Sequence, residues 1–208
     1  MSPKLAFFIG MLASACVPAV VNAEKPAERY VQRTHHLEGI ANAPASTLWA
    51  AFTDWGGVMK WFNAAPEKPY VRLIECPLLP GQKESDMPRT RRCRPDLSTF
   101  TSLPPEVKDP NFKVPENVDE HLLHQDDQSM YAVYSYNRDF HPGTTSVQVV
   151  SEGPCRSRFI IKYVVLEKAA ANASEAPEPV GDAFALKQDY RGLKFYAEKL
   201  AKDVPACK

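Results

Sequence analysis

Five histidines are the first residues whose chemistry suggests a functional site. His121 and His124 stand three residues apart in a segment with strand character. His35 and His36 are adjacent, and His141 precedes a proline, which places it in a predicted turn. Successive side chains of a strand point to opposite faces, so neither pair is positioned to share a metal ion. We therefore predict no metal and no cofactor, with a zinc site built from histidines as the alternative.

Nucleophilic catalysis lacks its usual sequence signature. The chain has no Gly-x-Ser-x-Gly motif, and no cysteine stands alone as a reactive thiol. Acid–base chemistry by a tyrosine, a histidine or a carboxylate stays open, although Asp54 is expected to end a helix and Glu120 to be solvated. One arginine of the segment Arg89–Arg94 could reach inward to a ligand carboxylate. A solvated strand face is the more ordinary interpretation of that segment.

The first 23 residues are predicted to be a cleaved secretory signal. They contain one basic residue, Lys4, then a long apolar run and small residues at the end, as signal peptidase requires. A membrane anchor and lipid attachment at Cys16 are the alternatives. The apolar run is short for a bilayer span of about 20 residues. We therefore expect a secreted or periplasmic protein without a stable membrane anchor.

Four cysteines follow the predicted signal, and an even set in an oxidising compartment predicts two disulfides. Four cysteines allow three pairings, and the absence of a Cys-x-x-Cys motif argues against zinc. Cys76 and Cys93 flank the turn sequence LLPGQ between two predicted strands, so we expect their side chains to face each other across a hairpin. The alternative is four free thiols in a cytosolic protein. The four residues are Cys76, Cys93, Cys155 and Cys207.

Composition limits the partners and the number of domains. Residues 24–208 fit a single domain. The 25 basic and 25 acidic residues give a formal net charge of zero, which offers no argument for nucleic acid or an anionic membrane surface. Many of the nineteen prolines lie between residues 66 and 115. We expect a long proline-rich loop over residues 95–117 and a polar linker over residues 168–179.

The periodicity of apolar residues predicts the elements that must position any site. A first strand over Tyr30–Leu37 is followed by a helix that opens near Pro44, a break at Asp54–Gly57 and a second short helix over Val58–Phe62. A long helix over Val180–Lys202 closes the chain, and Gly192 within it marks either a close approach to the sheet or to a ligand, or a tolerated glycine. Six further strands are predicted over Tyr70–Ile74, Arg89–Arg94, Val118–His124, Met130–Tyr136, Thr145–Ser151 and Arg158–Leu166.

All three tryptophans lie in one short stretch at the predicted corner between the two helices. Trp49, Trp55 and Trp61 are large enough to fill the space behind that corner. We expect them mainly in the core, because an aromatic cluster serves packing more often than ligand contact. In the last predicted strand, Phe159 and the residues two, four and six positions later share one face, which indicates a strand buried on one side.

These patterns together resemble a known superfamily. The segments IANAPASTLWAAFTDWGGVMKWF and DEHLLHQDDQSMYAVYSY, the strand that opens at Arg89-Thr90-Arg91 and the final strand and helix resemble START-like proteins. These are also called SRPBCC or Bet v 1-like proteins, and the likeness is to the polyketide cyclase/dehydrase and lipid transport branch. The resemblance implies an α+β helix-grip fold, in which a curved antiparallel sheet of six to seven strands wraps on the long C-terminal helix.

The same resemblance implies an apolar cavity between sheet and helix, and a pairing of Cys155 with Cys207 where the helix returns toward the last strand. A loop sequence, TSLPPE, is similar to the gate of plant hormone receptors of this superfamily, although the loop is longer than usual. The alternative is that the lining residues simply fill the core. The predicted lining is Trp61, Phe62, Leu103, Tyr134, Tyr136, Phe159, Ile161, Tyr163, Leu193 and Tyr196.

The function expected from this resemblance is that of a monomeric carrier for a small hydrophobic ligand, such as a lipid, a polyketide or an aromatic metabolite. A cyclase or related enzyme acting in the same cavity is the first alternative. A secreted interaction or stress protein without a ligand is the second. A titratable side chain inside the cavity with a displaced pKa would favour the enzyme.

Overall fold

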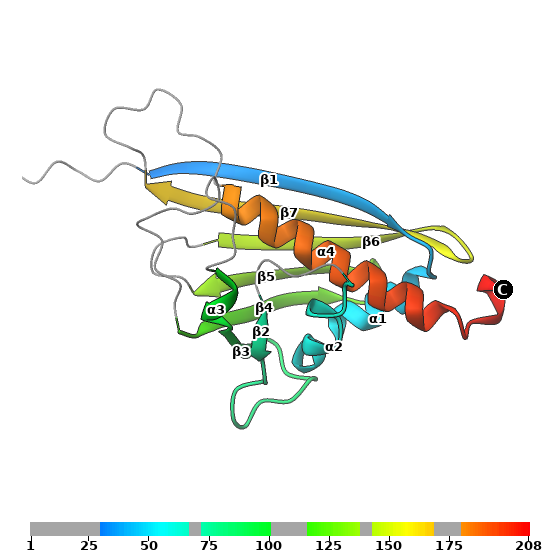
Figure 1. Cartoon of the computed structure of the whole chain (residues 1–208), viewed down its shortest axis with the longest axis horizontal. Helices are drawn as coiled ribbons and strands as arrows, with labels where there is room; N and C mark the ends of the chain where they lie inside the picture. The colour runs from blue at the N-terminus through cyan, green and yellow to red at the C-terminus, as the bar shows by residue number, and fades with distance from the viewer. Residues whose placement is uncertain (1–29, 67–71, 101–115, 138–142, 169–179) are drawn as a thin grey trace, which may run out of the picture.

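The computed structural model describes residues 30–66, 72–100, 116–137, 143–168 and 180–208. Within them the chain is an α+β protein with one open antiparallel sheet and a long C-terminal helix, as predicted (Figure 1). The sheet has seven strands in the order β1-β7-β6-β5-β4-β3-β2. Its two edges are therefore formed by the first two strands of the chain, which lie at opposite sides of the sheet.

The elements follow the predicted order along the chain. The helical segments are α1 (Ala45–Thr53), the 3-10 turn η1 (Trp55–Gly57), α2 (Met59–Phe62), α3 (Leu97–Phe100), α4 (Val180–Ala201) and the 3-10 turn η3 (Pro205–Cys207). The strands are β1 (Tyr30–Ala41), β2 (Leu73–Glu75), β3 (Arg89–Pro95), β4 (Val118–Asp126), β5 (Tyr131–Asn137), β6 (Gly143–Gly153) and β7 (Arg156–Lys168).

Several strands extend beyond their predicted ends: β1 continues to Ala41, and β7 covers Arg156–Lys168, so Lys168 belongs to a strand and not to the expected linker. The short helix α3 lies where a structureless loop was expected. Asp96 starts it, because its carboxylate accepts a hydrogen bond from the Ser98 backbone N–H at 3.1 Å and its carbonyl accepts one from Thr99. The Ser98 hydroxyl holds the pKa of Asp96 below its usual range. Strand β2 begins at Leu73, and the expected residues 70 and 71 lie outside the described part.

The faces of the sheet follow the two-residue period of its strands. In β7 the side chains of Phe159, Ile161, Tyr163 and Val165 are buried, whereas Arg158 and Lys162 are exposed. This confirms the predicted one-sided burial of the last strand. We call the buried side the inner face and the opposite side the outer face.

A β-bulge in β4 overturns the predicted orientation of two histidines. His121 lies opposite Ser135, and His124 lies opposite Val133, because the register shifts between Leu122 and His124. Ser135 and Val133 are two residues apart and therefore share one face. The extra residue thus places both histidines on the outer face, so the expectation of opposite faces was wrong.

The three tryptophans are buried, as predicted for a corner of the core. Trp55 has no exposed surface, Trp61 is 4 % exposed and Trp49 is 6 % exposed. Phe52 of α1 lies at the centre of this cluster, with ring centroids 5.8 Å from Trp49 and 6.2 Å from Trp55. The break between α1 and α2 at Asp54 therefore turns the chain so that large rings from both sides of the break reach one core.

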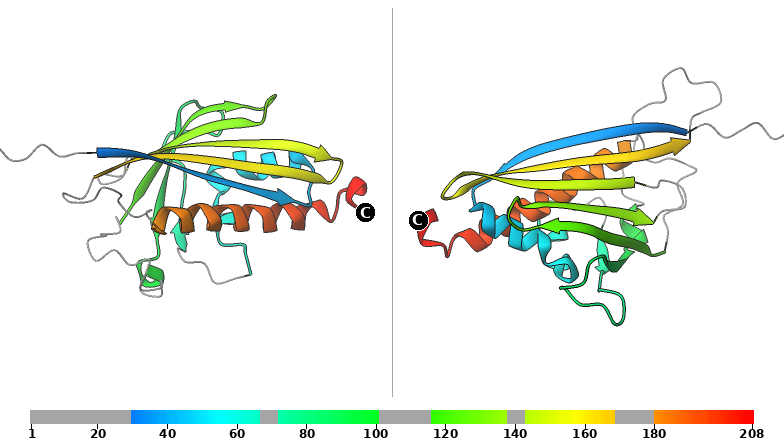
Figure 2. Two further views of the ribbon diagram at one scale, coloured as in Figure 1. Left: turned by 90° about the horizontal axis from the view of Figure 1, so that it is seen from above. Right: turned by 180° about the vertical axis from the view of Figure 1, so that it is seen from behind.

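Helix α4 runs along the sheet on the side of the inner face (Figure 2) and contacts α1, α2 and β1. Gly192 explains how close the helix comes to α2. A Cβ atom at this position would lie 2.4 Å from the carbonyl oxygen of Trp61. Gly192 therefore marks a close approach, as one of the two predictions had it, but the approach is to the backbone of α2 and not to the sheet or a ligand.

Both predicted cysteine pairs form disulfides. Cys76 joins Cys93, with 3.9 Å between their Cα atoms, and Cys155 joins Cys207, with 5.1 Å between theirs. Two such bonds indicate an oxidising environment, extracellular or periplasmic. Across the described residues, no helix has the length and apolar character that a membrane crossing needs.

Replacing Gly192 with alanine tests the packing of α4. The substitution removes the helix-propensity penalty of about 1 kcal/mol, but it forces a methyl group against backbone. We expect a net loss of about 1–3 kcal/mol in the free energy of unfolding, measured by denaturant titration. Lys199→Ala, on the exposed side of α4, is the control and should change stability by less than about 0.5 kcal/mol. A Gly192→Ala protein as stable as the wild type would contradict the close approach.

Peptide mapping without reduction tests the two disulfides. We expect one linked peptide pair containing Cys76 and Cys93 and another containing Cys155 and Cys207. Replacing Cys155 and Cys207 with alanine should lower the unfolding free energy by roughly 3–4 kcal/mol, because the bond closes a long loop. Linked peptides containing Cys76 and Cys155 would show that the strands pair differently.

Candidate functional site

A row of polar side chains crosses the inner face of the sheet from edge to centre. Strand pairing places His35 of β1 opposite Tyr163 of β7, Tyr163 opposite Thr145 of β6, and Thr145 opposite Tyr134 of β5. Directly paired residues in antiparallel strands share a face, so all four point to the inner side. We call these four residues the inner row. The row is the candidate functional site.

Aromatic contacts hold the two ends of the inner row. The rings of His35 and Tyr163 are stacked with 6.0 Å between their centroids. Gly143 makes room for Tyr163, since a Cβ at Gly143 would lie 2.3 Å from its ring. Tyr134 meets Trp55 edge to face at 5.3 Å. The row is therefore held in place by a ring contact on each side of Thr145.

Two polar atoms of the inner row are buried without a hydrogen-bond partner. Thr145 has no exposed surface, and its Oγ1 atom has no donor or acceptor within reach among the described residues. The Nε2 atom of His35 is likewise buried and has no hydrogen-bond partner among the described residues. A buried polar group left unpaired costs about 1–3 kcal/mol. Native structures seldom keep such groups without a reason.

The predicted lining residues lie together in the interior, but most belong to the packed core. Phe62 and Tyr196 are partly buried against that core. Leu103 and the side chain of Tyr136 lie outside the described part of the structure. The fully or nearly fully buried members are Trp61, Tyr134, Phe159, Ile161, Tyr163 and Leu193.

Three inner residues were missed by sequence reasoning. Tyr190 of α4 stacks on Phe159 at 6.2 Å and donates a hydrogen bond to the carbonyl of Ile40 at 2.8 Å. Burial raises the pKa of the Tyr190 hydroxyl. His35 and Thr145 each stand two residues from an apolar inner residue of their own strand. Alternation within β1 and β6 was therefore the signal that could have found them.

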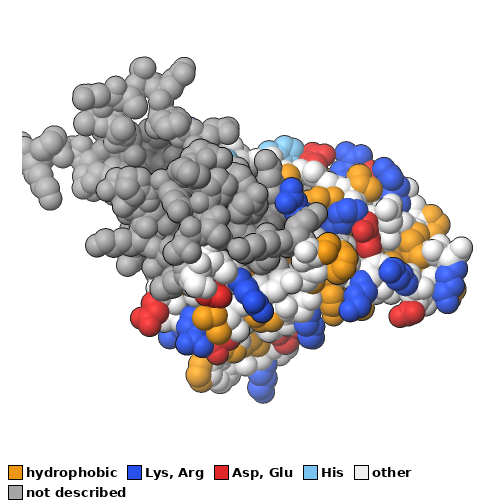
Figure 3. Space-filling view, in the orientation of Figure 1, with side chains coloured by type: hydrophobic (Ala, Val, Ile, Leu, Met, Phe, Trp, Pro, Cys, Tyr) orange, Lys and Arg blue, Asp and Glu red, His pale blue; other side chains and the backbone are white. Residues whose placement is uncertain are grey.

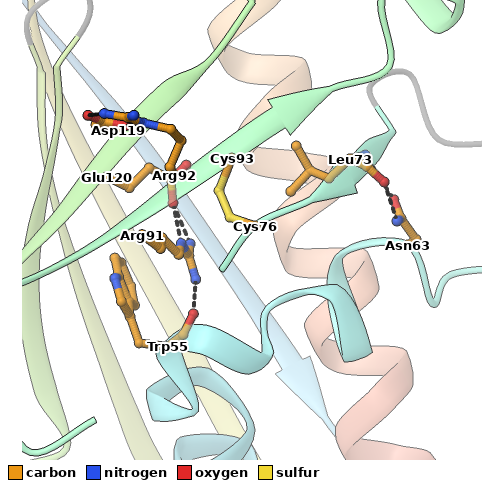
Figure 4. The surroundings of a disulfide bond; sticks show 9 residues. All are labelled: Trp55, Asn63, Leu73, Cys76, Arg91, Arg92, Cys93, Asp119 and Glu120. Carbon is orange, nitrogen blue, oxygen red and sulfur yellow. Dashed lines mark hydrogen bonds and ion pairs between the residues drawn. A yellow bond between two sulfur atoms is a disulfide. The ribbon is translucent and has the colours of Figure 1, made fainter. Parts of the chain in front are cut away.

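Two arginines of β3 point inward, contrary to the expectation of a solvated face. Arg91 donates from Nε to Glu120 Oε2 at 2.6 Å and from Nη1 to the Trp55 carbonyl at 3.1 Å (Figure 4). Its Cζ lies 3.7 Å from the centroid of the Trp55 ring. The side chains of Arg91 and Glu120 are 5 % and 13 % exposed, so the prediction that Glu120 is solvated was wrong.

Arg89 is the second inward arginine, and protein groups accept hydrogen bonds from its two terminal nitrogens. Its Nη2 atom donates to Gln125 at 2.7 Å and to the Thr53 carbonyl at 3.2 Å. Desolvation lowers the pKa of Arg89, and the nearby Glu84 partly offsets this. Neither arginine has a geometry that singles out a ligand carboxylate. Both connect β3 to the corner between α1 and η1 instead.

The remaining charges of the molecule are dispersed. On the coloured part of the face drawn in Figure 3, basic and acidic side chains are interspersed, with small apolar areas between them. No three histidine, cysteine or carboxylate side chains gather as a metal site would need, as far as the described residues extend. Asp54 ends α1, as predicted, and pairs with Lys60. Buried unpaired polar atoms also occur at Trp55 Nε1, Trp61 Nε1 and Ser157 Oγ, but the inner row places two such atoms along one line of paired residues.

Comparison with known proteins adds no assignment. No family model matches the chain, and no curated protein is significantly similar to it.

Removing the carboxylate of Glu120 tests the buried ion pair. Glu120→Ala leaves the Arg91 charge uncompensated in the interior, so we expect a loss of about 3–5 kcal/mol in unfolding free energy. Asp119→Ala is the matched control on the outer face. It breaks the pair with the half-exposed Arg92 and should cost no more than about 1 kcal/mol. Equal losses in the two variants, measured by urea titration, would contradict the assigned roles.

Proposed function

We propose that the protein is an exported carrier that holds a small hydrophobic molecule between the inner face and α4. The ligand would be a lipid, a polyketide or an aromatic metabolite. We also propose that the fold is the helix-grip arrangement of the START-like superfamily, because the sequence resembles that superfamily. Export is proposed from the signal-like residues 1–23, and the two disulfides agree with an oxidising destination.

The observation that carries the proposal is the position of α4 along a sheet face rich in aromatic and aliphatic side chains. Phe159, Ile161 and Tyr163 point from β7 toward the side on which α4 lies. Ligand sites in proteins are commonly formed between such apolar surfaces, with a few polar groups that orient the bound molecule. The inner row supplies polar groups of this kind.

Binding is favoured over catalysis by the titratable groups of the inner face. Burial and the nearby charge of Glu198 raise the pKa of Tyr190, and its hydroxyl donates a hydrogen bond to the carbonyl of Ile40. A catalytic acid or base must also present its titrating atom to the substrate. The geometry of Tyr190 instead anchors α4 to β1.

Native mass spectrometry of the protein purified from its own host tests the carrier function. We expect a species heavier than the polypeptide by the mass of one small molecule, which is lost after denaturation. Ile161→Phe adds volume on the inner face and should reduce the bound fraction. Ile160→Phe adds the same volume on the other side of β7 and should leave the bound fraction unchanged. Wild-type protein that carries no added mass would count against the proposal.

A further inference from the structure

The inner row carries two unsatisfied polar atoms at a defined spacing. His35 and Thr145 are separated by one strand, because both pair with Tyr163. Neighbouring strands lie about 4.8 Å apart, so the two residues are roughly 10 Å apart along the row. The Tyr163 ring lies between them and toward Gly143. The spacing suits two contacts along one edge of a small molecule rather than a single shared atom.

Both atoms can bond to an oxygen. A threonine hydroxyl donates and accepts, and the Nε2 atom of a histidine donates or accepts according to its tautomer. Apolar side chains follow both residues along their strands, Leu37 two positions after His35 and Val147 two positions after Thr145. Arg33, two positions before His35 on the same face, is the charged neighbour. In such surroundings the gain from supplying a missing partner is larger than it is in water. A hydrocarbon ligand would leave both atoms unpaired.

We propose that the ligand is an oxygenated hydrophobic molecule, with a hydroxyl or carbonyl oxygen that bonds to Thr145 Oγ1 and a further polar contact at His35 Nε2. This inference rests on the proposed carrier function and narrows its ligand class. The inner row then orients the molecule across the strands. A pure hydrocarbon would bind more weakly, because it would leave both polar atoms unpaired in the complex.

Calorimetric titration with naphthalene and 2-naphthol tests this inference, because the two probes differ only in a hydroxyl group. The wild-type protein should bind 2-naphthol about three- to tenfold more tightly than naphthalene, as expected for one net hydrogen bond. Thr145→Val should remove this preference and leave naphthalene affinity unchanged. Thr144→Val, one residue away on the outer face of β6, should keep it.

The adjacent histidines provide a second matched pair. 2,6-Dihydroxynaphthalene carries a second oxygen for His35, so the wild-type protein should bind it more tightly than 2-naphthol. His35→Leu should remove this additional gain, whereas His36→Leu on the outer face should keep it. Failure of all three probes to bind would overturn the carrier function for aromatic ligands and this inference with it. Equal binding of naphthalene and 2-naphthol, or a preference that survives in Thr145→Val, would overturn the inference alone.

A measurement without ligand separates a binding hydroxyl from a structural one. Thr145→Val keeps the shape of the side chain and removes a buried hydroxyl that lacks a partner. The ligand-free variant should therefore unfold at the same Tm as the wild type or at a higher one. A clearly lower Tm would show that the hydroxyl is bonded within the free protein, which contradicts the proposal.

Discussion

The buried guanidinium of Arg91 is the interaction on which the arrangement of the inner face depends. It connects Glu120 of β4, the carbonyl of Trp55 in η1 and the Trp55 ring. A buried charge is tolerated only when partners surround it. Strands β3 and β4 and the corner at η1 must therefore adopt their positions together. Since Trp55 packs against Tyr134, this constraint also sets one end of the inner row.

The two halves of the interior differ in how they are filled. Beneath α1, Phe52 meets Trp49, Trp55, Tyr134 and Phe159, so that end is closed by interlocking rings. Toward β1 the same face presents a threonine and a histidine whose polar atoms are unpaired. The ring-packed end also contains unpaired buried atoms, namely Trp55 Nε1, Trp61 Nε1 and Ser157 Oγ, but its rings interlock around them. The polar end keeps its unsatisfied groups, as functional sites often do at some expense of stability.

Covalent and close-packed contacts hold the periphery of this face. One disulfide joins Cys76, next to β2, to β3, and the other joins the turn between β6 and β7 to η3 after α4. Gly192 lets α4 approach the backbone of α2, and Tyr190 bonds to β1. The long helix is thus anchored along its second half. The middle of the inner face is held by side-chain packing alone, with no crosslink of its own among the described residues.

Local sequence patterns determined the order of elements, the buried face of β7, the tryptophan corner and both cysteine pairs. The elements and the buried face follow from the periodicity of neighbouring residues. The Cys76–Cys93 pair follows from the symmetry of a hairpin, and the Cys155–Cys207 pair was predicted from the resemblance to a family. Only the tertiary structure decided that Arg91 is buried, that a bulge in β4 turns His124 outward, and that His35 and Thr145 align. Those features depend on register between strands distant in sequence, where a shift of one residue moves every side chain to the other face.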